Sequence, residues 1–334
     1  MGSRGWHRAA TLAAVCVALA GCNASTAAVP PVTPSTDTVA TLTAPSVAGA
    51  APAAPLSTAT VPRALKARGR PAITKVLVIV EENHSLTQMR LGMPYLYGVA
   101  RRYGYATDYR AATHPSLPNY LAISGGSTLG VTDDEPPSAH HLHGPSVFGQ
   151  AISKGKTARL YAESLPAPCA TSNTGVFAVR HTPWAYFADE RVSCLRGSVA
   201  AGTPTAGRLS GDIRAGALPT VGMLVPDLRH DAHDGTLAEA DQWLEGWLPR
   251  LLAGPDYRAG RLAIVVTADE DDYTSVNRVL TVVIAPGVTH RVVATPLRHY
   301  SVTRLYAEVD GARPLRQATT APSLAKAFGL LTPP

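Results

Sequence analysis

The sequence is poor in charged residues, in aromatic residues and in cysteine. Of its 334 residues, 16% are Asp, Glu, Lys or Arg, 6% are aromatic and four are cysteine. Because 46% are hydrophobic, a wholly disordered chain is excluded, and the length allows a sizeable buried core. No apolar run reaches the ~18 residues of a membrane-spanning helix. The sequence contains no Cys-x-x-Cys pair, so it has no zinc-binding pattern of that kind.

The net charge of +6 is concentrated near the N-terminus. Residues 1–72 contain six basic residues and one acidic residue, whereas residues 73–334 contain 24 basic and 23 acidic residues. A domain that binds nucleic acid needs a basic face. The near-neutral balance after residue 72 therefore predicts no nucleic-acid partner.

The first 22 residues have the pattern of an export signal. Arg4 and Arg8 precede a short apolar stretch over residues 9–20, and small residues then lead to Cys22. The stretch is too short to span a membrane. The ending Leu-Ala-Gly-Cys resembles the lipobox of bacterial lipoproteins, which implies acylation of Cys22 and anchoring at the outer face of the cell membrane. The alternative is a soluble secreted protein whose signal contains a cysteine.

Residues 23–72 contain eight prolines, eight threonines and no aromatic residue, which predicts a disordered linker. One catalytic domain is then expected over residues 73–334, extracytoplasmic and monomeric. Cys16 belongs to the signal, so Cys169 and Cys194 remain in the domain. An even pair in an exported domain favours a disulfide over two free thiols.

Continuous apolar, β-branched runs occur at residues 75–80, 221–225, 262–266 and 280–284. Such runs are typical of strands buried on both faces. Between them lies a helical pattern over residues 237–252, which ends at Gly254-Pro255. Alternating buried strands and amphipathic helices predict a three-layer α/β/α sandwich with a mainly parallel central sheet.

Polar clusters follow three of these predicted strands. Glu82 and Asn83 follow the first, residues 226–234 follow the second, and Asp269 and Glu270 follow the third. In parallel sheets, ligands bind beyond the carboxyl ends of the strands. Converging carboxylate and amide oxygens suit a divalent metal ion, which can polarise a phosphoryl oxygen.

Ser116 lies in the segment His114-Pro115-Ser116-Leu117-Pro118, just before an apparent helix start. Free N–H groups and the helix dipole favour a bound phosphate there, so Ser116 is a candidate nucleophile. The plainer interpretation is a helix N-cap, to which Pro118 in the first turn is suited. The two roles are compatible.

These motifs resemble the bacterial phosphoesterase family, which contains acid phosphatases and phospholipases C and has the alkaline-phosphatase-like fold. The similarity begins with Glu82-Asn83-His84-Ser85 after a buried strand and continues with residues 114–121. Further matches follow in the same order at residues 161–164, 179–183, 226–228, 269–270 and 299–301. The resemblance covers residues 75–330, nearly all of the predicted domain.

The resemblance implies a role for each matching residue. Ser116 would be the nucleophile, one histidine would protonate the leaving alkoxide, and a divalent ion of unknown identity would be the cofactor. The implied catalytic residues are Ser116, His181, Asp231 and His233; the implied substrate-binding residues are Asn119, His114, His230 and His299; and the implied metal ligands are Glu82, Asn83, Asp269 and Glu270.

Some positions depart from the family pattern. Asp227 and His230 stand where Asn is more common, and Ala268 replaces an aromatic residue. Asp271 and Asp272 replace the Gly-rich and His continuation of many phospholipases C, which favours a phosphomonoesterase. His140, His141 and His143 follow Pro136-Pro137 and are interpreted as a surface turn rather than a metal site.

The sequence therefore predicts an exported, metal-assisted phosphomonoesterase of the acid phosphatase type that works through a phosphoserine. Its expected substrates are phosphorylated small molecules or phosphoinositide or phospholipid headgroups. The alternatives are a phospholipase C-type phosphodiesterase and a non-catalytic, ligand-binding surface lipoprotein. A serine esterase has the least support because no Gly-x-Ser-x-Gly motif is present.

Overall fold

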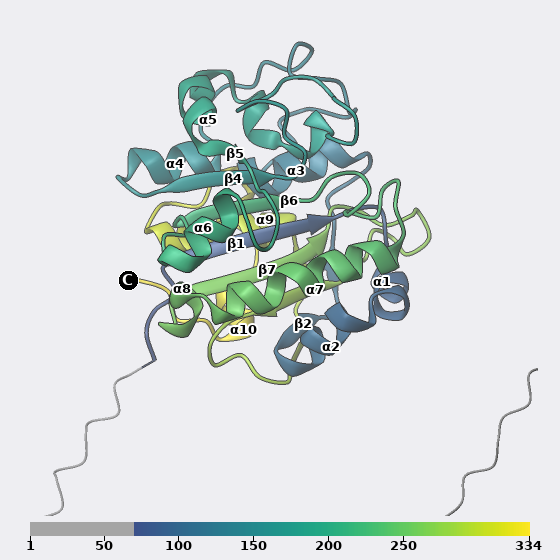
Figure 1. Ribbon diagram of the computed structural model, residues 1–334, viewed down its shortest axis with the longest axis vertical. Helices are drawn as coiled ribbons and strands as arrows, with labels where there is room; N and C mark the ends of the chain where they lie inside the picture. The colour runs from purple at the N-terminus through teal and green to yellow at the C-terminus, as the bar shows by residue number, and fades with distance from the viewer. Residues whose placement is uncertain (1–69) are drawn as a thin grey trace, which may run out of the picture. The chain divides into compact units, whose positions relative to one another are not determined.

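The computed structural model describes residues 70–334 (Figure 1). The predicted signal segment, Cys22 and almost the whole predicted linker lie outside the described residues. Within residues 70–334, no helix has both the length and the apolar character needed to cross a membrane.

An eight-stranded sheet forms the centre of the domain, in the order β5-β4-β6-β1-β7-β8-β2-β9. All neighbouring strands in it are parallel except β8, which is antiparallel to both β7 and β2. The strands of this sheet are β1 (Lys75–Glu81), β2 (Gly104–Ala106), β4 (Ala158–Ala162), β5 (Ser198–Ala200), β6 (Val221–Val225), β7 (Leu262–Ala268), β8 (Thr281–Ile284) and β9 (Arg291–Val293). A second, two-stranded sheet pairs β3 (Tyr109–Arg110) with β10 (Leu297–Arg298).

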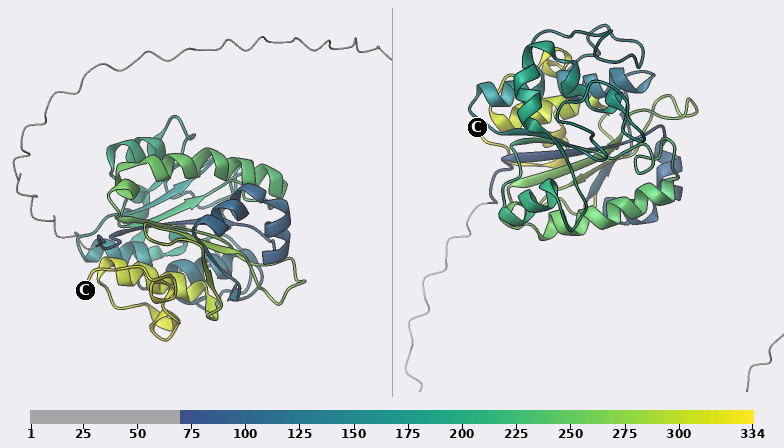
Figure 2. Two further views of the ribbon diagram at one scale, coloured as in Figure 1. Left: turned by 90° about the horizontal axis from the view of Figure 1, so that it is seen from below. Right: turned by 45° about the horizontal axis from the view of Figure 1, so that its top comes forward.

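Helices cover both faces of the sheet and complete three layers (Figure 2). One face carries α1 (Leu86–Gly92), α2 (Pro94–Arg102), α6 (Arg208–Ala215), α7 (Leu237–Ala253) and α8 (Pro255–Arg258). The other carries α3 (Ser116–Gly125), α4 (Val147–Ser153), α9 (His299–Asp310) and α10 (Leu324–Phe328). Near the β4–β5 edge lie α5 (Arg191–Gly197) and the 3-10 turns η1 (Val179–His181), η2 (Pro183–Tyr186) and η3 (Ala188–Glu190); η4 (Arg316–Thr319) follows α9.

The predicted α/β sandwich is confirmed, and its strongest elements lie where the patterns placed them. The run at 221–225 coincides with β6, while β1 and β7 extend slightly past their predicted ends. The helix at 237–252 is α7, which starts with a capping box between Thr236 and Glu239. The antiparallel direction of β8 was not expected, because a fully buried run reads the same in both directions.

Burial explains why these strands lie in the centre. The side chains of β1 from Val76 to Val80 are at most 1% exposed, and β7 is buried along its whole length. Burying each such aliphatic side chain contributes about 1.5–3 kcal/mol to the free energy of folding. In the parallel register, Glu81 pairs with Ala268 and Ile79 with Leu224. The segments that follow β1, β6 and β7 therefore leave the sheet at the same end, where the carboxyl ends of these three strands lie.

Cys169 and Cys194 form a disulfide that joins the segment after β4 to helix α5, which confirms the predicted pairing. The two cysteines are 25 residues apart. Closing a loop of this length restricts the unfolded chain.

We expect the double variant Cys169→Ser/Cys194→Ser to lose about 3 kcal/mol of unfolding free energy, because its unfolded chain regains that freedom. Guanidinium unfolding curves of wild type and variant measure the loss. Wild type in reductant serves as the control and should match the variant. Equal midpoints for oxidised wild type and variant would contradict the expectation.

Candidate active site

Ser116 is the first residue of α3 and is 3% exposed. Its hydroxyl donates a hydrogen bond to Glu82 Oε2 over 2.9 Å. The N-cap position is taken by Pro115, which makes no side-chain cap bond. The interpretation of Ser116 as an N-cap is therefore wrong: its hydroxyl is directed at a carboxylate beyond β1.

Glu82 is held by two residues of the same helix. Its Oε1 accepts a hydrogen bond from the Tyr120 hydroxyl over 2.7 Å, while Oε2 accepts that of Ser116. Tyr120 lies four residues after Ser116, so both face the same side of α3. Its ring also stacks on His181, with centroids 5.0 Å apart. Sequence reasoning missed Tyr120, although this spacing was visible in the sequence.

His181, from η1, lies between two buried carboxylates. Its Nε2 is 3.3 Å from Glu82 Oε1, and its Nδ1 is 3.1 Å from Asp231 Oδ2. The backbone N–H of Glu82 donates to the carbonyl of Asp231 over 2.7 Å, which ties the ends of β1 and β6 together. Glu82, His181 and Asp231 each present a ligand atom within 4.8 Å of the others. Together they form a possible metal-binding triad.

Asp269 completes the buried acidic group. Its Oδ1 accepts the backbone N–H groups of Asn83 over 3.1 Å and Glu270 over 2.7 Å. Asn83 adopts a left-handed conformation, with φ of 54°. The predicted ligand Asn83 thus contacts Asp269 through its backbone. Predicted residue His299 is fully buried, and its ring nitrogens contact the Asp269 carbonyl and the Tyr109 hydroxyl.

Asn119 and His114 both contact Glu270. Asn119 Nδ2 donates to Glu270 Oε2 over 2.8 Å, while its Oδ1 accepts the N–H groups of Ala112 and Thr113. Asn119 therefore holds the segment that leads into α3. The His114 Nδ1 is 3.1 Å from Glu270 Oε1, and its Nε2 is 3.3 Å from Asp271 Oδ1.

His233 is bonded to Arg180, with 2.9 Å between His233 Nε2 and Arg180 Nη2. A guanidinium only donates, so Nε2 accepts and the ring proton lies on Nδ1, 2.7 Å from Asp234 Oδ1. Arg180 Nε is also 3.8 Å from Asp134 Oδ2. Sequence reasoning singled out neither Arg180 nor Asp134 as a site residue.

Asp134 stands at the start of α3, where its Oδ1 accepts the N–H of Leu117 over 2.8 Å. This is the position that an anion takes at a helix N-terminus. Arg180 directly precedes His181 in the matching segment 179–183 and could have been noticed. Asp134 lies in a loop with no local signal.

His230 belongs to a second group, with Glu163 and Asp227. Its Nδ1 is 3.0 Å from Glu163 Oε2, and Asp227 accepts bonds from the Ser164 hydroxyl and the Arg229 N–H. The ligand atoms of these three residues also lie within 4.8 Å of one another, so they form a second possible metal-binding triad. The structure does not bring His230 into contact with Ser116 or Glu82.

Burial shifts the proton affinities of the acidic group. It raises the pKa of Glu82 well above its usual value, and the charges of Asp269 and Asp231 raise it further. Burial also raises the pKa of Asp231 and of Asp269 to about 7, and that of Glu270 to about 9. The pKa of His181 is lowered by burial, which keeps its imidazole neutral as metal binding requires.

The unpaired atoms of this group test whether a cation fits. Within residues 70–334, Asp231 Oδ2, Asp269 Oδ2 and His181 Nε2 are buried and lack a partner in hydrogen-bond geometry, although His181 lies 3.3 Å from Glu82 and 3.1 Å from Asp231. Carboxylate oxygens and one neutral imidazole are ligands that divalent ions accept. The residues present therefore fit a divalent metal ion.

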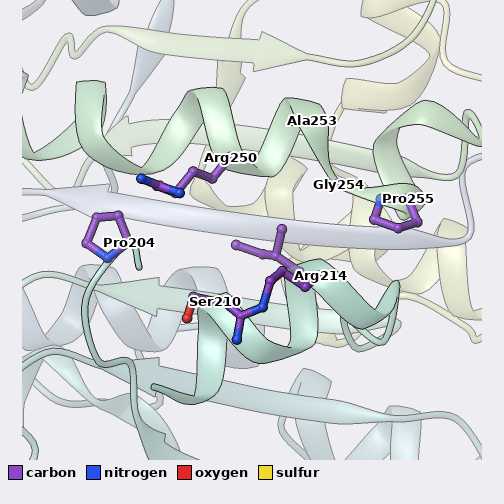
Figure 3. Close-up of a pocket in the computed structure, with 8 residues that line it drawn as sticks. Pro204, Ser210, Arg214, Arg250, Ala253, Gly254 and Pro255 are labelled. Atoms are coloured by element: carbon purple, nitrogen blue, oxygen red, sulfur yellow. The ribbon is translucent and has the colours of Figure 1, made fainter. Parts of the chain in front are cut away.

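One cavity adjoins the site, and two others lie elsewhere in the domain. One of about 430 Å³ adjoins the site and is lined by Arg110, Ala111, Ala112, His114, Asp271, Tyr273, Val276, Asn277 and Arg298. One of about 490 Å³ contains His141, which is exposed like His143, in agreement with the predicted surface turn. One of about 350 Å³ lies between α6 and α7 and contains no site residue (Figure 3).

A profile of the phosphoesterase family matches residues 88–309. A phosphatidylinositol-3-phosphatase of Mycobacterium tuberculosis is 30% identical over 271 residues, which cover 79% of this chain and 86% of that protein. A phosphate-repressible acid phosphatase of Penicillium chrysogenum is 25% identical over 209 residues, covering 59% of this chain and 49% of the fungal protein. This chain belongs to the phosphoesterase family and is a phosphoric ester hydrolase.

Two solved structures show the same fold. A Vibrio parahaemolyticus protein of the alkaline phosphatase superfamily aligns with a TM-score of 0.53 and 10% identity, over 78% of this chain and 72% of that one. A phosphonate monoester hydrolase from Silicibacter pomeroyi aligns with a TM-score of 0.51 and 13% identity, over 78% and 77%. The predicted alkaline-phosphatase-like fold is confirmed.

The raised pKa values of Asp231 and Asp269 predict how stability depends on pH when a chelator removes any bound cation. An unfolded Asp titrates near ~3.9. A carboxyl with a higher pKa in the folded protein stabilises it while protonated, and this contribution is lost as the pH rises through about 7. Asp231→Asn keeps a neutral side chain at every pH. Its Tm should therefore rise relative to wild type, by several degrees, between about pH 4 and pH 7.

Scanning calorimetry of both proteins in chelator, in matched buffers, measures this difference in Tm. A difference that is constant across the pH range would contradict the assignment of a raised pKa to Asp231.

Proposed function

We propose that this protein is an exported, metal-assisted phosphomonoesterase that transfers a phosphoryl group to Ser116 and then to water. The supporting observation is the Ser116 hydroxyl, buried at the first position of α3 and hydrogen-bonded to Glu82. The signal pattern over residues 1–22 and the disulfide between Cys169 and Cys194 support export.

The chemistry follows from the contacts of Ser116. Glu82 accepts the hydroxyl proton as the Ser116 Oγ–phosphorus bond forms and the ester bond to the alcohol breaks. In the second half, water attacks phosphorus and gives a proton to the group that protonated the alkoxide, the Oγ–phosphorus bond breaks, and Glu82 returns its proton to the serine as phosphate leaves. The first turn of α3 and its helix dipole would stabilise the negative phosphoryl oxygens once phosphate displaces the Asp134 carboxylate from the Leu117 N–H.

The leaving alkoxide needs a proton, and His114 is the histidine best placed to supply it. His181 and His299 are fully buried, and the Nε2 of His233 accepts a bond from Arg180. His114 lines the adjoining cavity, two residues before the nucleophile. This proposal moves the role from His181 and His233, the catalytic histidines implied by the sequence, to His114, which the sequence placed among the substrate-binding residues.

Glu82, His181, Asp231 and Asp269 would hold the metal ion. This set keeps Glu82 and Asp269 from the sequence-based ligands and adds His181 and Asp231, whereas Glu270 is bonded to Asn119 and Asn83 contacts Asp269 through its backbone N–H. When bound, the ion would neutralise the buried carboxylates and polarise a phosphoryl oxygen.

A phosphoinositide monophosphate is the proposed substrate class. The relative from M. tuberculosis is named a phosphatidylinositol-3-phosphatase and is matched over most of both chains. The acid phosphatase from P. chrysogenum supports monoester chemistry, although this chain spans about half of its length.

Ser116→Ala should lower the kcat for p-nitrophenyl phosphate at least about 10³-fold, because no other side chain replaces the attacking oxygen. Initial rates with added divalent metal measure it. The control is Ser124→Ala, because Ser124 lies on the same helix and its hydroxyl bonds only the Tyr120 carbonyl. Near-normal turnover by the Ser116 variant would refute its role as nucleophile.

Asp134→Asn should lower the inhibition constant for inorganic phosphate about fivefold, since the variant removes the negative charge that competes for the N-terminus of α3. Asparagine keeps an oxygen that can accept the Leu117 N–H. Asp133→Asn is the matched control, because Asp133 pairs with His140 outside the site. Weaker phosphate inhibition in the Asp134 variant would show a structural or catalytic role instead.

A further inference from the structure

Three arginines are direct neighbours across three backbone segments. Arg110 in β3 pairs in register with Arg298 in β10, and an isolated bridge pairs Arg110 with Arg278. Residues opposite each other on paired strands project from the same face, and like charges in these positions destabilise the pairing. We call Arg298, Arg110 and Arg278 the arginine row.

The charges of the row are only partly compensated. Arg110 Nε is 3.1 Å from Asp108 Oδ1, and its Nη1 donates to the Val276 carbonyl. Within the described residues 70–334, Arg278 and Arg298 form no ion pair. The two guanidinium groups are therefore available for an anion.

The row lies at the edge of the active site. Arg110 and Arg298 line the cavity of about 430 Å³ together with His114, which contacts Glu270. Arg298 also immediately precedes His299, whose ring contacts the carbonyl of Asp269. A ligand in this cavity would contact Arg110, Arg298 and His114, while Arg278 lies beside Arg110 outside the lining.

Two exposed hydrophobic side chains stand beside the row. Tyr273 is 76% exposed and Val276 is 80% exposed, and both line the same cavity. Their loop is held in place by Asp271, whose carboxylate accepts the N–H groups of Tyr273, Ser275 and Asn277. Arginines next to exposed aromatic and aliphatic side chains suit the interface of an anionic membrane, where charge and apolar contacts both contribute.

We propose that the arginine row binds the phosphodiester of a membrane-borne phosphoinositide while Tyr273 and Val276 enter the lipid interface. This inference rests on the proposed function. A phosphoinositide carries two kinds of phosphate: the monoester that Ser116 attacks and the diester that joins the headgroup to glycerol. Guanidinium groups bind such phosphate oxygens through charge-assisted hydrogen bonds. The row thus distinguishes a lipid substrate from a simple monoester.

The test compares two substrates on the full-length protein. One is phosphatidylinositol 3-phosphate in phosphatidylcholine vesicles, and the other is p-nitrophenyl phosphate, which lacks the diester and the lipid. Arg278→Ala and Arg298→Ala should each lower the ratio of kcat/KM for vesicles to kcat/KM for p-nitrophenyl phosphate about fivefold, and together more than tenfold. Arg298→Lys, which keeps the charge, should recover part of the loss.

Matched controls separate this site from a general effect of charge. Arg214 and Arg250 flank the cleft between α6 and α7 (Figure 3) and form no ion pair within residues 70–334. Arg214→Ala/Arg250→Ala removes the same charge and should keep the ratio. For the apolar side chains, Val276→Ser should lower the fraction of protein that sediments with vesicles. Val292→Ser should not lower it; Val292 is a valine on β9 that is 58% exposed.

The outcomes distinguish failure of this inference from failure of the proposed function. A wild type that hydrolyses neither substrate refutes the proposed function. If wild type hydrolyses both and the Arg278 and Arg298 variants keep its ratio, or match the Arg214/Arg250 control, the arginine row is not a headgroup site. A water-soluble dibutanoyl analogue forms the last arm: if Val276→Ser lowers kcat/KM equally on this analogue and on vesicles, the membrane contact of Tyr273 and Val276 is overturned.

Discussion

Everything at the site depends on burying several carboxylates at one edge of a parallel sheet. Glu82, Asp231 and Asp269 are fully buried and follow β1, β6 and β7, which are neighbours in the sheet. Removing carboxylates from water is costly unless hydrogen bonds or opposite charges compensate. Ser116 and Tyr120 compensate Glu82, and two backbone N–H groups compensate Asp269. The oxygens left unpaired are those on which a cation would act.

The sequence was sufficient for the fold and for the location of the site because both follow from local patterns. A buried apolar run predicts a strand, and parallel strands carry their C-terminal residues to a common edge. Glu82, Asp231 and Asp269 were therefore brought together as expected. The direction of β8 was not predictable in this way, since it depends on how distant segments pair.

The detailed contacts of individual side chains were harder to predict. His299 and Asn119 were expected to bind substrate, yet their contacts within the protein hold the end of β7 and the segment before α3. His230 pairs with Glu163 after a neighbouring strand. In each case the residue type and strand end were visible in the sequence. The partner that orients the side chain comes from another part of the chain, so a local motif does not specify it.

The net charge of the domain conceals two opposed clusters. Residues 73–334 are almost neutral in sum, but His114 contacts the acidic residue Glu270 and lines one cavity with Arg110 and Arg298 of the arginine row. A phosphate dianion that approaches Glu82, Asp231 and Asp269 without a cation is repelled by them. Attraction must then come from Arg180, the start of α3 and groups at the rim. A site with this arrangement favours ligands that carry charge beyond the reacting phosphate, because only these engage the interior and the rim together.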